Sequence, residues 1–238
     1  MAGEMISIDV DGAAMPAYAI RAETPGVPGV IVLQEIFGVD AGIKAIADLV
    51  ATLGYGVVAP NIFHRTHPDL DAPHDAAGTA LGRAAAGAVT VEGLRADLVA
   101  AVRYLRLECE APRVATWGFC FGGSVAFLSA TLEEIDAAVS FYGGQIATSP
   151  FPGLPPLLER TGDLVAPLFF AFGGSAAHVP RDDVETIGRR LTEHGKHYAL
   201  ELYPDEGHGF FRDGPEGSPG ARDVWPKVRA FLQRHLGA

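Results

Sequence analysis

Strand-like runs alternate with helical patterns along most of the chain, and this alternation restricts its possible folds more than any other feature. Runs rich in β-branched and aromatic residues, which favour strands, occupy residues 5–10, 17–22, 29–35, 55–61, 113–119, 137–143, 167–173 and 197–204. Helical spacing or helix-compatible composition marks residues 42–54, 76–88, 90–108, 124–134, 181–195 and 221–237. Such alternation produces a mostly parallel sheet with helices on both faces, so the sequence predicts the α/β class.

The first two strand-like runs have no helix between them. Their connecting segment, "DVDGAAMPAY", indicates a hairpin, so we expect an antiparallel edge on the N-terminal side of the sheet. In the last helix, Pro226 is tolerable if it lies near the first turn. With 238 residues, no internal repeat and no long low-complexity linker, the sequence indicates one domain over residues 1–238.

Composition and charge limit the class of partner. Hydrophobic residues make up 48% of the chain and charged residues 20%, which is typical of a globular protein. The formal net charge of −11 argues against nucleic acid and anionic membranes as partners, although local arginines can still bind a small anion. The N-terminal segment lacks a signal-peptide pattern, and no run of 18 uncharged apolar residues occurs. Cys109 and Cys120 show no disulfide or metal-ligand spacing, which favours a reducing cytoplasm.

The segment "GFCFGG" at residues 118–123 lies between a strand-like run and a helical pattern. It has the form G-x-C-x-G, a nucleophile elbow with cysteine in place of serine. Side chains two residues before or after Cys120 would collide with the neighbouring strand and helix, which explains the glycines. The elbow would also aim the Phe121 backbone N–H at a developing oxyanion, and the helix N-terminus favours a thiolate. The alternative reading is a glycine-rich turn that holds an inert thiol.

His208, in "YPDEGHGFF", is the candidate base for this nucleophile. It follows the last strand-like run, which matches the order nucleophile, acid, histidine along the chain. His64, His67 and His74 precede the elbow and are in the wrong order, and the remaining histidines, including His178, lie in or beside helices or at a strand start. Glu35 closes the apolar run "GVIVLQE" and should lie at a strand end, where reactive groups gather.

Four segments together resemble the dienelactone hydrolase (carboxymethylenebutenolidase) family, a cysteine branch of the α/β-hydrolases. They are "VIVLQEIFGV" at 30–39, "GFCFGG" at 118–123, "FYGG" at 141–144 and "YPDEGHGFFR" at 203–212. The resemblance covers nearly the whole chain. It implies an α/β-hydrolase fold and cleavage of a carboxylate-bearing enol-lactone in aromatic compound degradation, with no metal or nucleotide cofactor.

The resemblance also implies roles for individual residues. Cys120 is expected to be the nucleophile, His208 its base, and Glu35 a group that contacts the resting thiol and gives way to substrate. The backbone N–H groups of Ile36 and Phe121 are expected to form the oxyanion hole.

Arginines are expected to bind the substrate carboxylate, because a guanidinium holds a carboxylate through two hydrogen bonds. Arg212 matches one family position, Arg83 is our choice for the second, and Arg65 is the alternative to Arg83. Tyr142 is expected either to line the pocket or to belong to the core.

The triad acid departs from this pattern. The family places an aspartate in a segment of the form G-G-x-D-x-H-x-P, and the corresponding segment "GGSAAHVP" at 173–180 has Ala176 there. Three explanations stay open: an engineered substitution, a natural homologue with a weakened site, or another acid. The substitutes to consider are Asp182, Asp183, Asp205 and Glu206.

Taken together, the sequence predicts a hydrolase that opens a small anionic lactone or ester through a cysteine thioester, as a monomer or small homo-oligomer. The alternative is a catalytically impaired homologue that binds a small ligand. A redox-responsive thiol protein ranks last, because Cys109 lies in the preceding helix and is poorly placed to resolve Cys120.

Overall fold

The structure, a computed structural model, describes residues 3–148, 153–176 and 179–237. Eight strands form one sheet in the order β1-β2-β4-β3-β5-β6-β7-β8. The strands are β1 Glu4–Val10, β2 Ala13–Ile20, β3 Gly29–Leu33, β4 Gly56–Pro60, β5 Val114–Phe119, β6 Ala137–Phe141, β7 Leu168–Gly173 and β8 Tyr198–Tyr203. All eight strand-like runs are therefore confirmed as strands.

The N-terminal edge of the sheet is antiparallel, as expected. β1 and β2 form a hairpin, and β2 also pairs antiparallel with β4. Asp11 and Gly12 both have positive φ at the hairpin turn, the backbone that suits a tight connection between twisted strands. From β4 to β8 every neighbouring pair is parallel.

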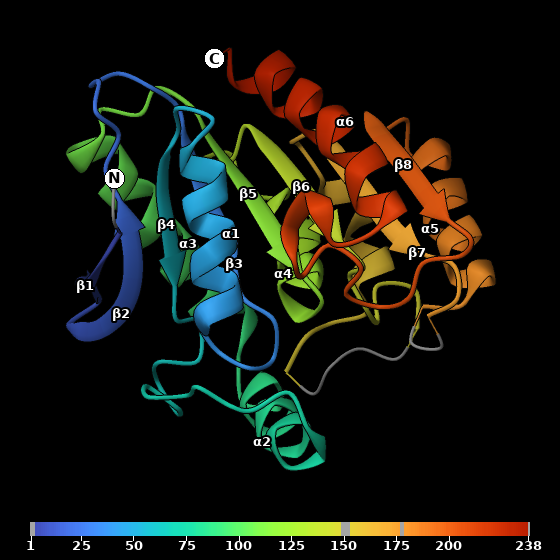
Figure 1. Cartoon of the computed structure of the whole chain (residues 1–238), viewed down its shortest axis with the longest axis horizontal. Helices are drawn as coiled ribbons and strands as arrows, with labels where there is room; N and C mark the ends of the chain where they lie inside the picture. Colours follow the sequence, from blue (N-terminus) through green and yellow to red (C-terminus); the bar gives the residue numbers. More distant parts are fainter. Residues whose placement is uncertain (1–2, 149–152, 177–178, 238) are drawn as a thin grey trace.

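Helices cover both faces of the sheet (Figure 1). They are α1 Ala41–Ala51, α2 Ala76–Gly87, α3 Val91–Glu108, α4 Phe121–Ser129, α5 Arg181–Glu193 and α6 Pro219–Leu236. The apolar sides of α1 and α6 share one buried cluster with the sheet, and those of α3, α4 and α5 share the other. Among the described residues, no helix has the length and hydropathy needed to cross a membrane.

Two helices differ from expectation at their ends. α4 begins at Phe121, directly after Cys120, and ends at Ser129, because Thr131 and Leu132 bond three residues back in tighter turns. α6 begins at Pro219, where Ser218 caps the helix by accepting the Ala221 N–H at 3.1 Å. Pro226 therefore lies inside the helix, and the expectation that it sits near the first turn was wrong.

The carboxyl ends of the parallel strands meet at one edge of the sheet. Glu35 follows β3, Cys120 follows β5, Tyr142 follows β6, Ala176 follows β7 and His208 follows β8. In Figure 1 this edge faces downward, and α2 lies beyond it as a separate helix below the sheet. The fold thus gathers the sequence-predicted residues on one side, as expected for open parallel sheets.

Candidate active site

Cys120 occupies a strained backbone position between β5 and α4. Its φ is 53° and its ψ is −114°, a region that residues with a side chain rarely adopt. The Cys120 N–H donates to the Phe141 carbonyl at 3.0 Å, which ties this turn to the end of β6. A cysteine held in such a conformation is typical of a nucleophile elbow rather than an inert turn.

The elbow glycines are required by close backbone packing. A Cβ at Gly118 would overlap the carbonyl of Gly122, and a Cβ at Gly122 would overlap the carbonyl of Leu33 at the end of β3. The Gly122 N–H also donates to the Gln34 carbonyl at 3.0 Å, so the helix start and the β3 loop are in direct contact. The expected collisions with strand and helix are confirmed.

Burial favours the protonated form of the Cys120 thiol. Burial raises its pKa to about 12, and the negative charge of Glu35 acts in the same direction. A hydrogen bond from the Phe121 backbone N–H opposes the rise, as do the charges of Arg212 and Arg83. Attack on a substrate therefore needs a base, a change in the charges around the sulfur, or both.

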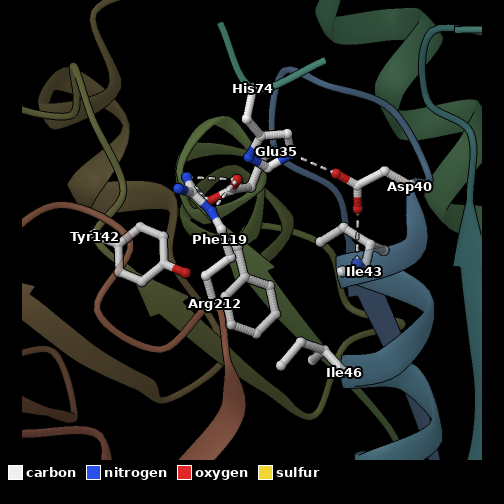
Figure 2. A pocket seen from close by; sticks show the side chains of 9 residues that line it. Glu35, Asp40, Ile43, Ile46, His74, Phe119, Tyr142 and Arg212 are labelled. Atoms are coloured by element: carbon white, nitrogen blue, oxygen red, sulfur yellow. Dashed lines mark hydrogen bonds and ion pairs between the residues drawn. The ribbon is translucent and has the colours of Figure 1, made fainter. Parts of the chain in front are cut away.

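Glu35 and Arg212 form an ion pair with two hydrogen bonds (Figure 2), and the charges of both residues act on the Cys120 thiol. Arg212 Nε donates to Oε2 and Nη2 donates to Oε1 of Glu35, both at 3.0 Å. Glu35 is 3% exposed, and its burial raises the pKa of the carboxyl, while the charges of Arg212 and His74 act to lower it. The group expected at the thiol and the group expected at the substrate carboxylate therefore bind each other in this structure.

Tyr142 lines a cavity of about 20 Å³ that also contacts the ion pair. It has a positive φ of 41°, and its N–H donates to the Ala171 carbonyl at 2.7 Å. The ring is buried, so Tyr142 belongs to the core and faces the pocket as well. The cavity is lined by Glu35, Asp40, Gly42, Ile43, Ile46, His74, Phe119, Tyr142 and Arg212.

His208 lies next to Tyr142, in the loop after β8. The two ring centroids are 5.1 Å apart and the rings are inclined by 64°. The pKa of the buried Tyr142 hydroxyl is raised by its burial and, to a smaller extent, by the charges of Glu35 and Cys120. Tyr142 is thus electrostatically close to the nucleophile and in ring contact with the candidate base.

The two arginines considered for the second carboxylate contact differ in their partners. Arg83 projects from the exposed side of α2, and its charge is felt at the Cys120 thiol. Arg65 binds the fully buried Asp97 through Nη1 at 2.9 Å and Nη2 at 2.9 Å, and His64 binds the same carboxylate at 3.0 Å. Arg65 is therefore already engaged in a buried ion-pair network. This leaves Arg83 as the stronger candidate for the second contact with the substrate carboxylate.

Ala176 lies in the turn after β7, 7% exposed, and carries no oxygen in its side chain. The turn is fastened to the segment before His208, because the Ser175 N–H and hydroxyl donate to the Glu206 carbonyl at 3.0 and 2.7 Å. His178, two residues further on, lies outside the described residues.

The substitute acids lie apart from this turn or have other partners. The Glu206 carboxylate accepts the Gly220 N–H at 2.6 Å, at the start of α6. Asp205 is exposed, and Asp182 and Asp183 lie in the first turn of α5, as the sequence suggested. These placements favour none of the four as the triad acid.

Sequence reasoning missed His74 and Asp40. His74 was set aside because it precedes the elbow, yet it lines the cavity and its Nε2 lies 2.7 Å from Asp40 Oδ2. A single sequence carries no signal that pairs two residues 34 positions apart. Asp40 does have a local signal, because it precedes a helical pattern and caps α1 by accepting the Ile43 N–H at 2.9 Å.

The described residues contain no group of three histidines, cysteines or carboxylates placed to hold a metal ion. The groups that the structure places at this edge include a thiol, an imidazole, a buried carboxylate and two guanidinium groups.

Comparisons with known proteins show which family the chain is similar to. The sequence model described as "Dienelactone hydrolase family" matches residues 15–236. A Synechocystis protein named "Putative carboxymethylenebutenolidase" is 33% identical over 214 residues, covering 88% of this chain and 87% of the relative. A Bradyrhizobium protein named "Probable 2-oxo-3-(5-oxofuran-2-ylidene)propanoate lactonase" is 30% identical over 250 residues, covering 99% and 96%.

A solved structure is similar to this chain over nearly its whole length. The crystal structure described as a "Putative Dienelactone Hydrolase" from Klebsiella pneumoniae superimposes with a TM-score of 0.87 at 30% identity. The superposition covers 98% of this chain and 98% of that one.

Proposed function

Because this chain belongs to the dienelactone hydrolase family, and is thus an ester or lactone hydrolase of the α/β-hydrolase fold, we propose that it opens a small carboxylate-bearing enol-lactone through a thioester on Cys120. The strained φ of 53° at Cys120 is the observation that carries the proposal. A related ester is an equally suitable substrate, since the same atoms react. The Bradyrhizobium relative, named as a lactonase, supports the lactone assignment.

The proposed reaction begins when the substrate carboxylate takes the place of Glu35 on Arg212, with Arg83 as the second cation. His208 accepts the thiol proton as the Cys120 sulfur attacks the carbonyl carbon. The N–H groups of Ile36 and Phe121 donate to the oxyanion that forms. The ring C–O bond then breaks, His208 returns the proton to the leaving enolate oxygen, and water hydrolyses the thioester.

The first prediction concerns the covalent intermediate. Incubation with a dienelactone should add the substrate's mass to the intact protein, because a site with Ala176 should hydrolyse the thioester slowly. Cys120→Ala should abolish the adduct and lower kcat by about 10⁴-fold or more, as loss of a nucleophile does in related triads. Intact-protein mass spectrometry and ring-opening absorbance measure the two effects. An adduct that survives in Cys120→Ala would exclude Cys120 as the nucleophile.

The second prediction concerns the substrate carboxylate. Arg212→Gln and Arg83→Gln should each lower kcat/KM for the charged lactone by roughly 10- to 100-fold, since a charge-assisted contact contributes about 1.5–3 kcal/mol. The methyl ester of the same lactone lacks the charge and should lose much less. Equal losses on both substrates would mean that the arginines support structure instead. Arg181→Gln, on the exposed side of α5, is the control.

Ala176 favours a second candidate, a small-ligand-binding homologue with little turnover. Binding of the charged lactone without adduct or ring opening, measured by calorimetry, would support it. We infer a cytoplasmic location from the reduced cysteines expected of this composition, and a monomer or small homo-oligomer as the assembly.

A further inference from the structure

His74 is held in a defined orientation at the mouth of the cavity. Its Nε2 lies 2.7 Å from Asp40 Oδ2, and its ring stacks on Phe37 with centroids 4.0 Å apart and planes inclined by 19°. Asp40 is itself fixed, because its other oxygen caps α1. The Ala72 N–H also donates to the Phe37 carbonyl at 2.9 Å, so the segment that carries His74 is fastened to the loop that carries Glu35.

The groups whose charges act most strongly on the Glu35 carboxylate can be named. Arg212 and His74 stabilise its carboxylate, Asp40 opposes it, and the Cys120 sulfur and Tyr142 hydroxyl are the other titratable groups that sense it. Figure 2 shows the His74 ring between Asp40 and the Glu35–Arg212 pair. His74 thus lines the same cavity as Glu35 and is, after Arg212, the second group that lowers the pKa of the Glu35 carboxyl.

Substrate binding creates a difficulty for Glu35. A substrate carboxylate on Arg212 takes away both hydrogen bonds that now hold Glu35, whose side chain is 4% exposed. A buried carboxylate without a partner is strongly unfavourable, so the exchange needs another group that accepts the displaced charge.

We propose that His74, oriented by Asp40, is a positioning residue that stabilises the Glu35 carboxylate while a substrate carboxylate occupies Arg212. The inference rests on the proposed function in one respect, that an incoming carboxylate binds Arg212. Asp40 Oδ2, 2.7 Å from His74 Nε2, fixes the orientation of the imidazole, and the cap on α1 keeps Asp40 in place. His74 acts through Glu35 and has no direct contact with the reacting atoms in this scheme.

Two alkylating reagents test this without any lactone. Iodoacetate and iodoacetamide both form a sulfur–carbon bond with Cys120 and release iodide, but only iodoacetate carries a carboxylate that can compete for Arg212. We expect His74→Phe, which keeps the ring on Phe37, to lower the iodoacetate-to-iodoacetamide rate ratio by about tenfold, or roughly 1.4 kcal/mol. His74→Gln, which removes the imidazole, should lower the ratio similarly. His67→Gln, on the same loop, is the control and should leave it unchanged.

A Glu35→Gln background separates the possible causes. There the ratio should no longer respond to His74→Phe, because no carboxylate is left to stabilise. The proposal is overturned if His74→Phe or His74→Gln unfolds at the wild-type temperature and still has the wild-type iodoacetate-to-iodoacetamide rate ratio. A loss that persists in the Glu35→Gln background also overturns it, because His74 would then bind the reagent directly. If the wild-type protein and every variant fail to open lactones, the proposed function is overturned instead. The two outcomes can be told apart because alkylation is measured independently of turnover.

Discussion

The carboxyl ends of β5 and β7 are built alike but present different side chains. Both end in glycines that face a neighbouring backbone at close range: Gly118 and Gly122 at β5, and Gly173 and Gly174 against residues 204–207 at β7. The first turn presents the Cys120 thiol from a strained backbone, whereas the second presents the methyl group of Ala176.

The difference supports our proposal that the β7 turn has the backbone of a catalytic turn without its functional group. At β5 the close packing and the reactive side chain occur together. At β7 the turn is still tied to the His208 loop through Ser175 and Glu206, although Ala176 offers no acceptor. Substitution at 176 should therefore change chemistry with little change in backbone position.

In the comparison of the two turns, the largest expected effect comes from disrupting the backbone packing of the β5 turn. Gly122→Ala places a Cβ against the Leu33 carbonyl, so the elbow must shift. A displacement of about 1 Å lowers catalytic rates by about 10²-fold, and we expect at least that loss in kcat together with a lower unfolding temperature. Gly144→Ala, where no atom lies within 4 Å of the added Cβ, should change both little. Equal effects in the two variants would show that the packing at Gly122 is not specific to the elbow.

The next effect comes from completing the β7 turn. Ala176→Asp should raise kcat by roughly 10- to 100-fold, because a charge-assisted hydrogen bond to an imidazole contributes about 1.5–3 kcal/mol. The gain should appear in kcat rather than KM, since the bond strengthens as His208 takes up its proton. Ring-opening kinetics of a dienelactone measure both constants.

A control variant tests whether another acid already acts on His208. Glu206→Gln keeps an oxygen for the Gly220 N–H but removes the charge, and should change kcat by less than about twofold if Glu206 has only its present structural partner. A kcat within twofold of wild type in Ala176→Asp would mean that a different residue supplies the acid, with Asp183 and Asp205 the next to substitute.

The smallest expected effect is on the reactivity of the Cys120 thiol at the β5 turn, and it tests the electrostatic influence of Glu35. Glu35→Gln removes a negative charge that raises the pKa of the Cys120 thiol, so the thiolate fraction at a given pH should increase. We expect iodoacetamide to react with Cys120 about three- to tenfold faster at pH 8, which corresponds to a fall in pKa of roughly 0.5 to 1. In wild type the rate should rise steadily with pH without a plateau below about pH 10, since the thiol pKa is about 12. A plateau near neutral pH would contradict this.

Local patterns explain why much of the fold was predictable. Strands β3, β4, β5, β6 and β7 are buried along their whole length, so their apolar runs stand out in the sequence. The G-x-C-x-G spacing of the elbow is also a local pattern, although Gly122 packs against the distant Leu33. The hairpin was equally local, because Asp11 and Gly12 form its turn. The position of Pro226 was misjudged because the Ser218 cap was overlooked.

The remainder of the site depends on contacts between distant segments. Arg212 meets Glu35 across 177 positions, and His74 meets Asp40 across 34, distances at which a single sequence carries no pairing signal. The sequence favoured Arg83 with Arg65 as the alternative, and the buried Asp97 shows that Arg65 is already engaged. The family resemblance placed Arg212 and Glu35 at the site, but their direct contact is a property of the three-dimensional structure.

The protonated Cys120 also bears on the protein's durability. Peroxides and other cellular oxidants attack thiolates much faster than thiols, so a sulfur whose pKa is about 12 is a poor target for them. Cys109 caps the end of α3 near the start of β4, at the opposite edge of the sheet, and is too distant to form a disulfide with Cys120. The enzyme should thus keep Cys120, the proposed nucleophile, reduced through long idle periods, and sulfenic acid formation should be most rapid during turnover, when the surrounding charges have been rearranged.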